Sequence, residues 1–150
     1  MSRNFENLQA HIVPLSEADN FHDATAEWKL FDVAVHENWD NCPCGKEIKE
    51  LCYIQNELNG NKTYVGNVCV NNFIGIATGN LFAGLKRIAV DETANPNEDL
   101  IEHAYELGYI FENEYKFLMD TKRKRNLSTR QLGWKLKINR RIINKTVVRR

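Results

Sequence analysis

The stretch that decides the fold spans residues 42–69 and reads CPCGKEIKELCYIQNELNGNKTYVGNVC. It contains every cysteine of the 150-residue chain, at positions Cys42, Cys44, Cys52 and Cys69. Four thiol ligands in so short a stretch are enough to fill one tetrahedral Zn²⁺ sphere and leave none over. The spacing therefore predicts one structural zinc site, with these four cysteines as its ligands.

Two alternatives to zinc remain open. Disulfides form in oxidising compartments, whereas residues 1–15 lack the apolar core of a secretory signal. Four unrelated buried thiols are the second alternative, and the clustering of the cysteines argues against it. His36, just ahead of Cys42, is a reserve ligand that would replace Cys52. With four thiolates the site would be closed and structural, because a catalytic zinc keeps an open position.

The order of predicted elements around the cysteines is turn, strand, hairpin, strand and helix. Residues 41–45 are expected to turn, and residues 48–58 are compatible with a strand. Asn59-Gly60 predicts a two-residue hairpin, since both residues tolerate a positive φ. Residues 62–65 form the returning strand, and Asn67 is placed to cap a helix that carries Cys69 in its first turn.

This order resembles the treble-clef or zinc-ribbon-like arrangement, in which a knuckle, a hairpin and a helix N-terminus meet at one metal ion. The resemblance is carried by residues 42–45, by Asn59-Gly60 and by residues 65–69. The chain departs from the usual pattern with one residue between Cys42 and Cys44 and one ligand on the helix. Cys52 would therefore have to supply the fourth ligand.

Residues 38–75 are also similar to short zinc-binding segments in uncharacterised proteins of bacteriophages and bacterial mobile elements. The residues that carry this likeness are Cys42, Cys44, Gly45, Asn56, Val65, Gly66, Cys69, Val70 and Phe73. The helix opening at residues 127–131, followed by Trp134, resembles a C-terminal motif of such proteins. The resemblance implies a phage or accessory-genome setting and brings no activity with it.

The remaining elements predict an α+β protein. Residues 1–15 look irregular, Ser16 begins a helix that runs to about Trp28, and residues 31–35 alternate as a strand. Helices are expected at 80–90, from a start at Asn95-Pro96 to Gly108, at 109–122 and at 129–144, the last behind a capping box at Ser128. We expect a zinc-binding α+β domain over residues 1–90 and a helical extension over 91–150. The extension ends in a basic helix and is expected to pack on the first part.

Composition bounds the class of protein. A hydrophobic content of 43 % and an aromatic content of 10 % are typical of a globular chain. No window approaches the roughly 18 continuous apolar residues of a membrane span. We therefore expect a cytoplasmic protein, in a bacterial cell and encoded by a phage if the resemblance holds.

A net charge of zero hides a strong asymmetry. Residues 121–150 contain 12 basic residues and no acidic one, whereas residues 1–120 hold all 20 acids and 8 basic residues. Such asymmetry favours a nucleic acid or an acidic protein surface as partner. The candidate nucleic-acid contacts are Lys122, Arg123, Lys124, Arg125, Arg130, Lys137, Arg140 and Arg141. In the alternative, the basic helix folds back on the acidic body and is neutralised there.

The sequence carries no pattern for catalysis. A nuclease of the treble-clef type needs a histidine in or beside its hairpin, and residues 53–65 contain none. The glycines do not form a phosphate-binding loop, and no triad of nucleophile, histidine and acid can be assembled. We expect a non-enzymatic protein that binds DNA or RNA. We expect no small-molecule substrate. The alternative is a phage effector that inhibits or redirects a host protein, with its acidic body imitating nucleic acid.

Overall fold

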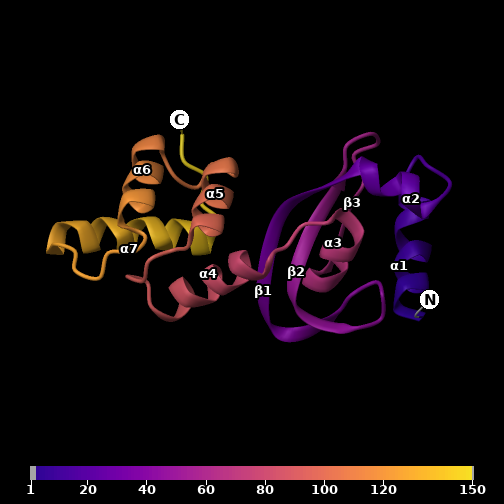
Figure 1. The fold of residues 1–150 in the computed structure, drawn as a ribbon, viewed down its shortest axis with the longest axis horizontal. Coiled ribbons are helices and arrows are strands. Elements are labelled where there is room, and N and C mark those ends of the chain that lie inside the picture. The colour runs from indigo at the N-terminus through magenta and orange to yellow at the C-terminus, as the bar shows by residue number, and fades with distance from the viewer. Residues whose placement is uncertain (1–2, 150) are drawn as a thin grey trace. The chain divides into compact units, whose positions relative to one another are not determined.

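A computed structural model describes residues 3–149 and shows an α+β protein. The chain divides into two compact units, one reaching to Thr78 and the other starting at Gly79. The domain boundary that the sequence predicted, after residue 90, falls within the second unit, at the end of the helix Gly79–Val90. The two units are described separately below (Figure 1).

The first unit is built on a three-stranded antiparallel sheet in the order β1-β2-β3. Its strands are β1 (Trp28–Asn41), β2 (Glu47–Asn56) and β3 (Lys62–Gly66). On the central strand β2, Leu51 pairs with Ala34 of β1 on one side and with Gly66 of β3 on the other. The pairing of β1 with β2 continues past a register shift between Val35 and Asp40. β1 is therefore much longer than the strand predicted for residues 31–35.

The hairpin between β2 and β3 is longer than the sequence predicted. Asn56 donates its N–H to the carbonyl of Asn61, so four residues form the loop instead of two. The side chain of Asn56 explains the difference, because its Oδ1 accepts from the amides of Leu58 and Asn59 and builds a wider turn. Gly60 closes this turn with a φ of +79°.

One face of the sheet is covered by α3 (Asn67–Ile74), as Figure 1 shows. Val70 and Phe73 of this helix are buried, and so are Ile54 and Val65 on the strands beneath it. The helix begins directly after β3 and ends at Gly75, whose φ of +78° is typical of a helix C-terminus. The helix begins where the sequence predicted it, but the predicted cap at Asn67 is wrong: Gly66 occupies the N-cap position without a side-chain cap, and Asn67 Nδ2 donates instead to Glu50 Oε2 at 2.7 Å.

A helix that the sequence analysis did not predict opens the chain. Residues 1–15 were expected to be irregular, but α1 (Arg3–Ile12) and a 3-10 turn (Val13–Leu15) occupy the described part of this segment. Phe5, Leu8 and Ile12 have helical spacing, and this signal was missed among the polar residues. The expected helix from Ser16 to Trp28 is reduced to α2 (Phe21–Ala24) and a second 3-10 turn (Thr25–Glu27).

Aromatic side chains join these N-terminal elements to the rest of the first unit. Phe21 stacks on Phe73 of α3 with ring centroids 5.2 Å apart, and Phe5 of α1 meets Phe21 edge-on at 5.3 Å. Trp28, at the start of β1, lies 6.4 Å from Phe73. Four elements therefore share one aromatic cluster.

Glu27 ties the segment between α1 and β1 to the hairpin. Its carboxylate accepts the amide N–H groups of Glu17 at 2.7 Å and Ala18 at 2.8 Å. It also accepts from Asn56 Nδ2 at 2.9 Å, and the residue is only 7 % exposed. The bond from Asn56 and the bond from the Glu17 amide lower the pKa of Glu27, against the opposing effect of desolvation.

The second unit is entirely helical within the described residues. Its helices are α4 (Gly79–Val90), α5 (Glu98–Glu106), α6 (Glu112–Thr121) and α7 (Thr129–Asn144). Asn97 caps α5 by accepting from the amide of Leu100, and Ser128 caps α7 in the predicted capping box with Gln131. The predicted start at residue 129 therefore agrees with the structure, whereas α5 begins two residues after the predicted start at Asn95-Pro96, because Asn97 provides the cap.

The core of the second unit combines apolar side chains with a buried carboxylate. Fully buried apolar residues line the helix contacts, namely Ile88, Leu100, Ile101, Ala104, Ile110, Leu118 and Ile138. Glu114, 4 % exposed, accepts from Trp134 Nε1 at 3.0 Å and from Arg141, so α6 and α7 are joined by a hydrogen-bonded charge pair. None of the helices in residues 3–149 combines the length and the hydropathy that crossing a bilayer requires.

We predict that Glu27→Gln lowers the melting temperature of the first unit at pH 7. A lowered native pKa means that the ionised carboxylate stabilises the fold at pH values above its ordinary pKa and ceases to do so as the carboxylate becomes protonated. The difference from the unsubstituted protein should therefore shrink below pH 4.5. Thermal unfolding followed by circular dichroism between pH 3 and pH 7 measures it.

Glu57→Gln is the matched control. The side chain of Glu57 forms an exposed ion pair with Lys29, and the hydrogen bond from its amide to the carbonyl of Glu27 survives the substitution, so the melting temperature should change little. Equal effects of the two substitutions would contradict the assigned role of Glu27.

Candidate metal centre and basic surface

A tight turn between β1 and β2 carries the first two cysteines. The amide of Cys42 donates to the carbonyl of Lys46, and the amide of Gly45 donates to the carbonyl of Cys42, both at 2.8 Å. Gly45 has a φ of +101°, which a residue with a side chain rarely adopts. The turn therefore holds Cys42 and Cys44 in a fixed arrangement with both side chains 2 % exposed.

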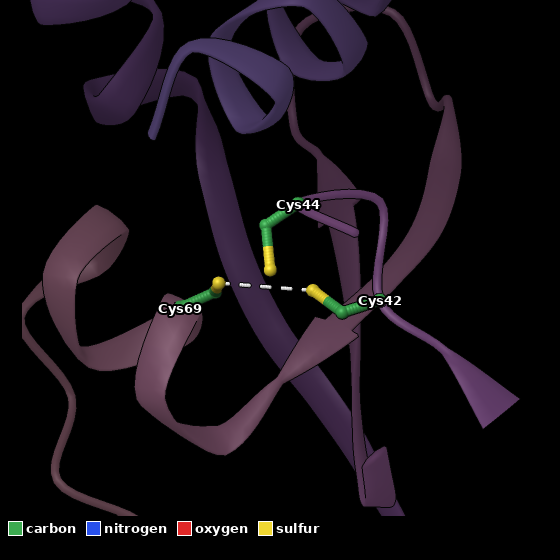
Figure 2. A group of neighbouring side chains, drawn as sticks. All are labelled: Cys42, Cys44 and Cys69. Carbon is green, nitrogen blue, oxygen red and sulfur yellow. Dashed lines mark hydrogen bonds between the residues drawn. The ribbon is translucent and has the colours of Figure 1, made fainter. Parts of the chain in front are cut away.

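Cys69 approaches the same point from the first turn of α3. Figure 2 shows the sulfurs of Cys42, Cys44 and Cys69 pointing toward one another. All three sulfurs lie within 4.8 Å of one another, and the sulfurs of Cys42 and Cys69 are 3.7 Å apart. Sulfurs bound to one zinc at about 2.3 Å in a tetrahedron are separated by about 3.8 Å. The three thiols therefore fit a single metal ion.

Hydrogen bonds to Cys42 favour its thiolate, the form that binds metal. Cys69 hydrogen-bonds to its sulfur, the amide of Gly66 donates to it at 3.3 Å, and the amide of Cys44 also contributes. Together they lower the pKa of Cys42 to about 5, although desolvation opposes them. The pKa of Cys69 is raised, first by its hydrogen bond to Cys42 and then by burial.

The structure does not bring Cys52 to the other three cysteines. Cys52 lies in the middle of β2, where it pairs with Val33 and Val65, and its sulfur is 4.0 Å from Thr78 Oγ1. Burial raises the pKa of Cys52 to about 12, so the residue remains a thiol. The predicted fourth ligand is therefore wrong, since Cys52 does not belong to the cluster of Cys42, Cys44 and Cys69.

His36, the reserve ligand, is also placed elsewhere. Its Nδ1 lies 2.6 Å from Asp40 Oδ2, and both residues belong to β1. Within the described residues, Cys42, Cys44 and Cys69 are the cluster of thiol, imidazole and carboxylate groups that could hold a metal ion. Three thiolate sulfurs suit a borderline-soft ion such as Zn²⁺ and leave one position of a tetrahedron to another ligand.

The unpredicted helix α1 covers this centre. Asn7 Nδ2 donates to the carbonyl of Cys44 at 3.1 Å, and His11 Nε2 lies 2.7 Å from Thr63 Oγ1. A hollow of about 400 Å³ beside the cysteines is lined by Phe5, Leu8, Cys44, Lys46, Val68 and Cys69. Lys46 brings a positive charge to a cluster that becomes negative when its thiols ionise.

The predicted basic residues divide into two groups in the second unit. Three of them form ion pairs with acids of the same unit, which are Lys122 with Glu98 at 3.1 Å, Arg140 with Glu92 at 2.6 Å, and Arg141 with Glu114. The sequence analysis left open that acidic residues elsewhere in the chain neutralise the basic C-terminal segment. These three pairs neutralise part of it, and the acids belong to α5, α6 and the 91–95 loop of the second unit.

The other five predicted residues remain exposed. They are Arg123, Lys124, Arg125, Arg130 and Lys137, and none forms an ion pair within the part of the chain that the structure describes. They occupy the segment between α6 and α7 and the part of α7 from Arg130 to Lys137. We name these five side chains the basic surface.

Lys135 and Trp134 of α7 have structural positions. Lys135 is fully buried, donates to Asn95 Oδ1, and its Nζ lies 5.9 Å from the centre of the Phe117 ring. Burial lowers the pKa of Lys135. Trp134 stacks on Phe117 at 4.3 Å and donates to Glu114, so its ring is held in the helix contact. A run of basic residues in a sequence does not reveal which member points inward.

Comparisons with protein-family models, with curated proteins and with solved structures find no match to this chain.

We predict that Cys52→Ala retains one zinc per chain, whereas Cys44→Ala lowers zinc affinity by at least about 100-fold. Cys44 contributes one of the three convergent sulfurs, and Cys52 only fills space near Thr78. Both variants remove one thiol from a buried site, so they are matched. Metal content after gel filtration and competition with a chromogenic chelator give the two numbers. Zinc loss in Cys52→Ala as large as in Cys44→Ala would restore the four-cysteine site.

Proposed function

We propose that this chain is a non-enzymatic nucleic-acid-binding protein stabilised by one zinc ion. The observation that carries the proposal is the basic surface, five exposed cationic side chains without an ion pair in the described residues. Phosphate contacts need exposed lysine and arginine, and they supply most of the affinity for nucleic acid. Arginine, three of the five, also matches the geometry of phosphate oxygens.

The charge of the second unit supports the same conclusion. From residue 79 onward the sequence contains 15 basic and 9 acidic residues, and up to residue 78 it contains 5 basic and 11 acidic residues. The ion pairs of Lys122, Arg140 and Arg141 lower the number of available cations but leave an excess. We therefore narrow the contact set to Arg123, Lys124, Arg125, Arg130 and Lys137.

We assign the zinc to Cys42, Cys44 and Cys69 in a treble-clef-like module. A knuckle, a hairpin and the start of a helix surround the three sulfurs, as in that arrangement. The sheet beneath is small, and a metal ion bound by the native state contributes its binding free energy to folding. In this proposal the zinc stabilises the first unit and does no chemistry on a substrate.

The proposal predicts salt-dependent binding of oligonucleotides by the zinc-loaded chain. Affinity should fall by orders of magnitude between about 50 mM and about 200 mM salt, because released counterions drive the association. Arg130→Glu combined with Lys137→Glu should lower the salt slope by about two. Fluorescence anisotropy with labelled single- and double-stranded oligonucleotides measures both effects.

Lys116→Glu is the control for charge reversal in the same unit. Lys116 is exposed and pairs with Glu112 on α6, outside the basic surface. The absence of binding at low salt would overturn the proposal and favour the alternative, a phage effector whose acidic first unit docks on a basic host protein. A pull-down from bacterial lysate that recovers a defined protein would then support that alternative.

Removal of zinc is predicted to loosen the first unit alone. A strong chelator should accelerate hydrogen exchange at the amides of residues 42–69 and leave the amides of α7 protected, because the cysteines belong to the first unit. Exchange followed by mass spectrometry on proteolytic peptides resolves the two regions. Unchanged protection at residues 42–69 in the metal-free protein would contradict a stabilising role for zinc.

A further inference from the structure

The second unit contains a hollow of about 430 Å³ that the sequence analysis did not anticipate. It lies between the end of α4, the loop of residues 91–95 and the segment that follows α6. Its charged lining residues are Arg87, Asp91, Lys122, Arg123, Lys124 and Arg125. Arg87 is remote in sequence from the basic C-terminal run, yet the fold brings it to the same hollow.

The charges in this hollow are unbalanced. Asp91 is its one lining carboxylate, and Asp91 Oδ1 already accepts from the amide of Thr93 at 3.1 Å and from its hydroxyl at 2.8 Å. Lys122 pairs with Glu98 outside the lining. Arg87, Arg123, Lys124 and Arg125 have no carboxylate partner in the described residues. Four cations around one concave surface repel one another unless an anion is shared between them.

Two asparagine side chains hold the wall of the hollow in place. Asn95 Nδ2 donates to the carbonyl of Lys124 at 2.8 Å, which joins the 91–95 loop to the basic segment. Asn139 Nδ2 donates to the carbonyls of Glu92 at 2.7 Å and Ala94 at 2.9 Å. The loop is therefore fixed to α7 from below, and the hollow has a defined backbone shape.

The buried amine of Lys135 adds to this positive potential. It donates to Asn95 Oδ1, and Asn95 itself lines the hollow. Lys135 has no carboxylate partner in residues 3–149, although it is fully buried. A buried positive charge without a counter-charge is stabilised by an anion nearby.

We propose that this hollow binds a phosphate group, held by Arg87 together with Arg123, Lys124 and Arg125. Guanidinium groups give phosphate two parallel hydrogen bonds each, and a doubly charged anion offsets the repulsion among the four cations. On the proposed function, on which this part rests, the phosphate belongs to the nucleic-acid backbone. The hollow then adds Arg87 of α4 to the contacts of the basic surface.

The test uses the full zinc-loaded chain with Arg87→Glu and, as the matched control, Lys116→Glu. Both substitutions reverse one exposed charge on a helix of the second unit, but Lys116 does not line the hollow. Pyrophosphate is titrated while backbone amide shifts are recorded by NMR, and labelled oligonucleotides are titrated in parallel by anisotropy.

The expected result has two parts. Pyrophosphate shifts the amides of residues 91–95 and 122–125 in the unsubstituted chain and in Lys116→Glu, but not in Arg87→Glu. Arg87→Glu weakens oligonucleotide binding about tenfold and lowers the salt slope by about one, whereas Lys116→Glu does neither. Arg123→Glu, on an exposed segment outside any helix, must reproduce the pyrophosphate result if Arg87→Glu fails to fold.

The outcomes separate this inference from the proposed function. Oligonucleotide binding that Arg87→Glu and Arg123→Glu leave unchanged, without amide shifts from pyrophosphate, overturns the hollow and retains the basic surface. Pyrophosphate binding in the hollow without any oligonucleotide binding at low salt overturns the proposed function and makes the ligand a free phosphate compound. Amide shifts of equal size in all four proteins overturn the hollow as the site.

Discussion

The close approach of Gly66 to Cys42 is the contact on which the first unit depends. The amide of Gly66 donates to the sulfur of Cys42, and a side chain at residue 66 would place its Cβ 2.9 Å from Ile48 Cγ2. A Cβ at residue 66 would press on Ile48 of β2, so the glycine allows β3 to lie this close to β2, with Cys42 Sγ at an ordinary contact distance of 3.9 Å. Because α3 starts at the next residue, the same contact sets where Cys69 enters. The packing of the backbone at Gly66 therefore brings the three sulfurs together, because it fixes both the end of the hairpin and the start of α3.

Charge has two different roles in the second unit. Arg141 and Glu114 join α6 to α7 in the interior, and Lys135 is buried beside Asn95. These charged groups stabilise the helical unit and are largely buried. The five side chains of the basic surface remain exposed, although the net charge of the whole chain is zero. Net charge and even charge runs therefore predict the class of partner less well than the pairing seen in the structure.

The sequence predicts features that depend on neighbouring residues well. It predicts less well which distant residues meet at one site. The capping box at Ser128 depends on residues within one turn of the helix end, so its prediction agrees with the structure, whereas the cap predicted at Asn67 lies one residue too far along the chain. Cys52 looked equivalent to the other cysteines because spacing alone does not say how far along a strand a side chain lies from a turn. Its pairing with Val33 and Val65 depends on the register of three strands, which short-range patterns do not contain. Helix α1 was missed for a different reason, since its apolar spacing was present but outnumbered by polar residues.

The bonds around Glu27 bear on how the metal-binding part can be isolated. Glu27 holds the backbone of residues 17–18, and Asn59 and Asn61 at the hairpin tip donate to the carbonyl of Leu15. A fragment beginning at β1 would lack Glu27 itself, so the side chain of Asn56 in the hairpin would lose its carboxylate acceptor and the hairpin tip would lose the carbonyl of Leu15. A fragment that keeps the hairpin and its cysteines in this arrangement therefore has to begin at or before Leu15.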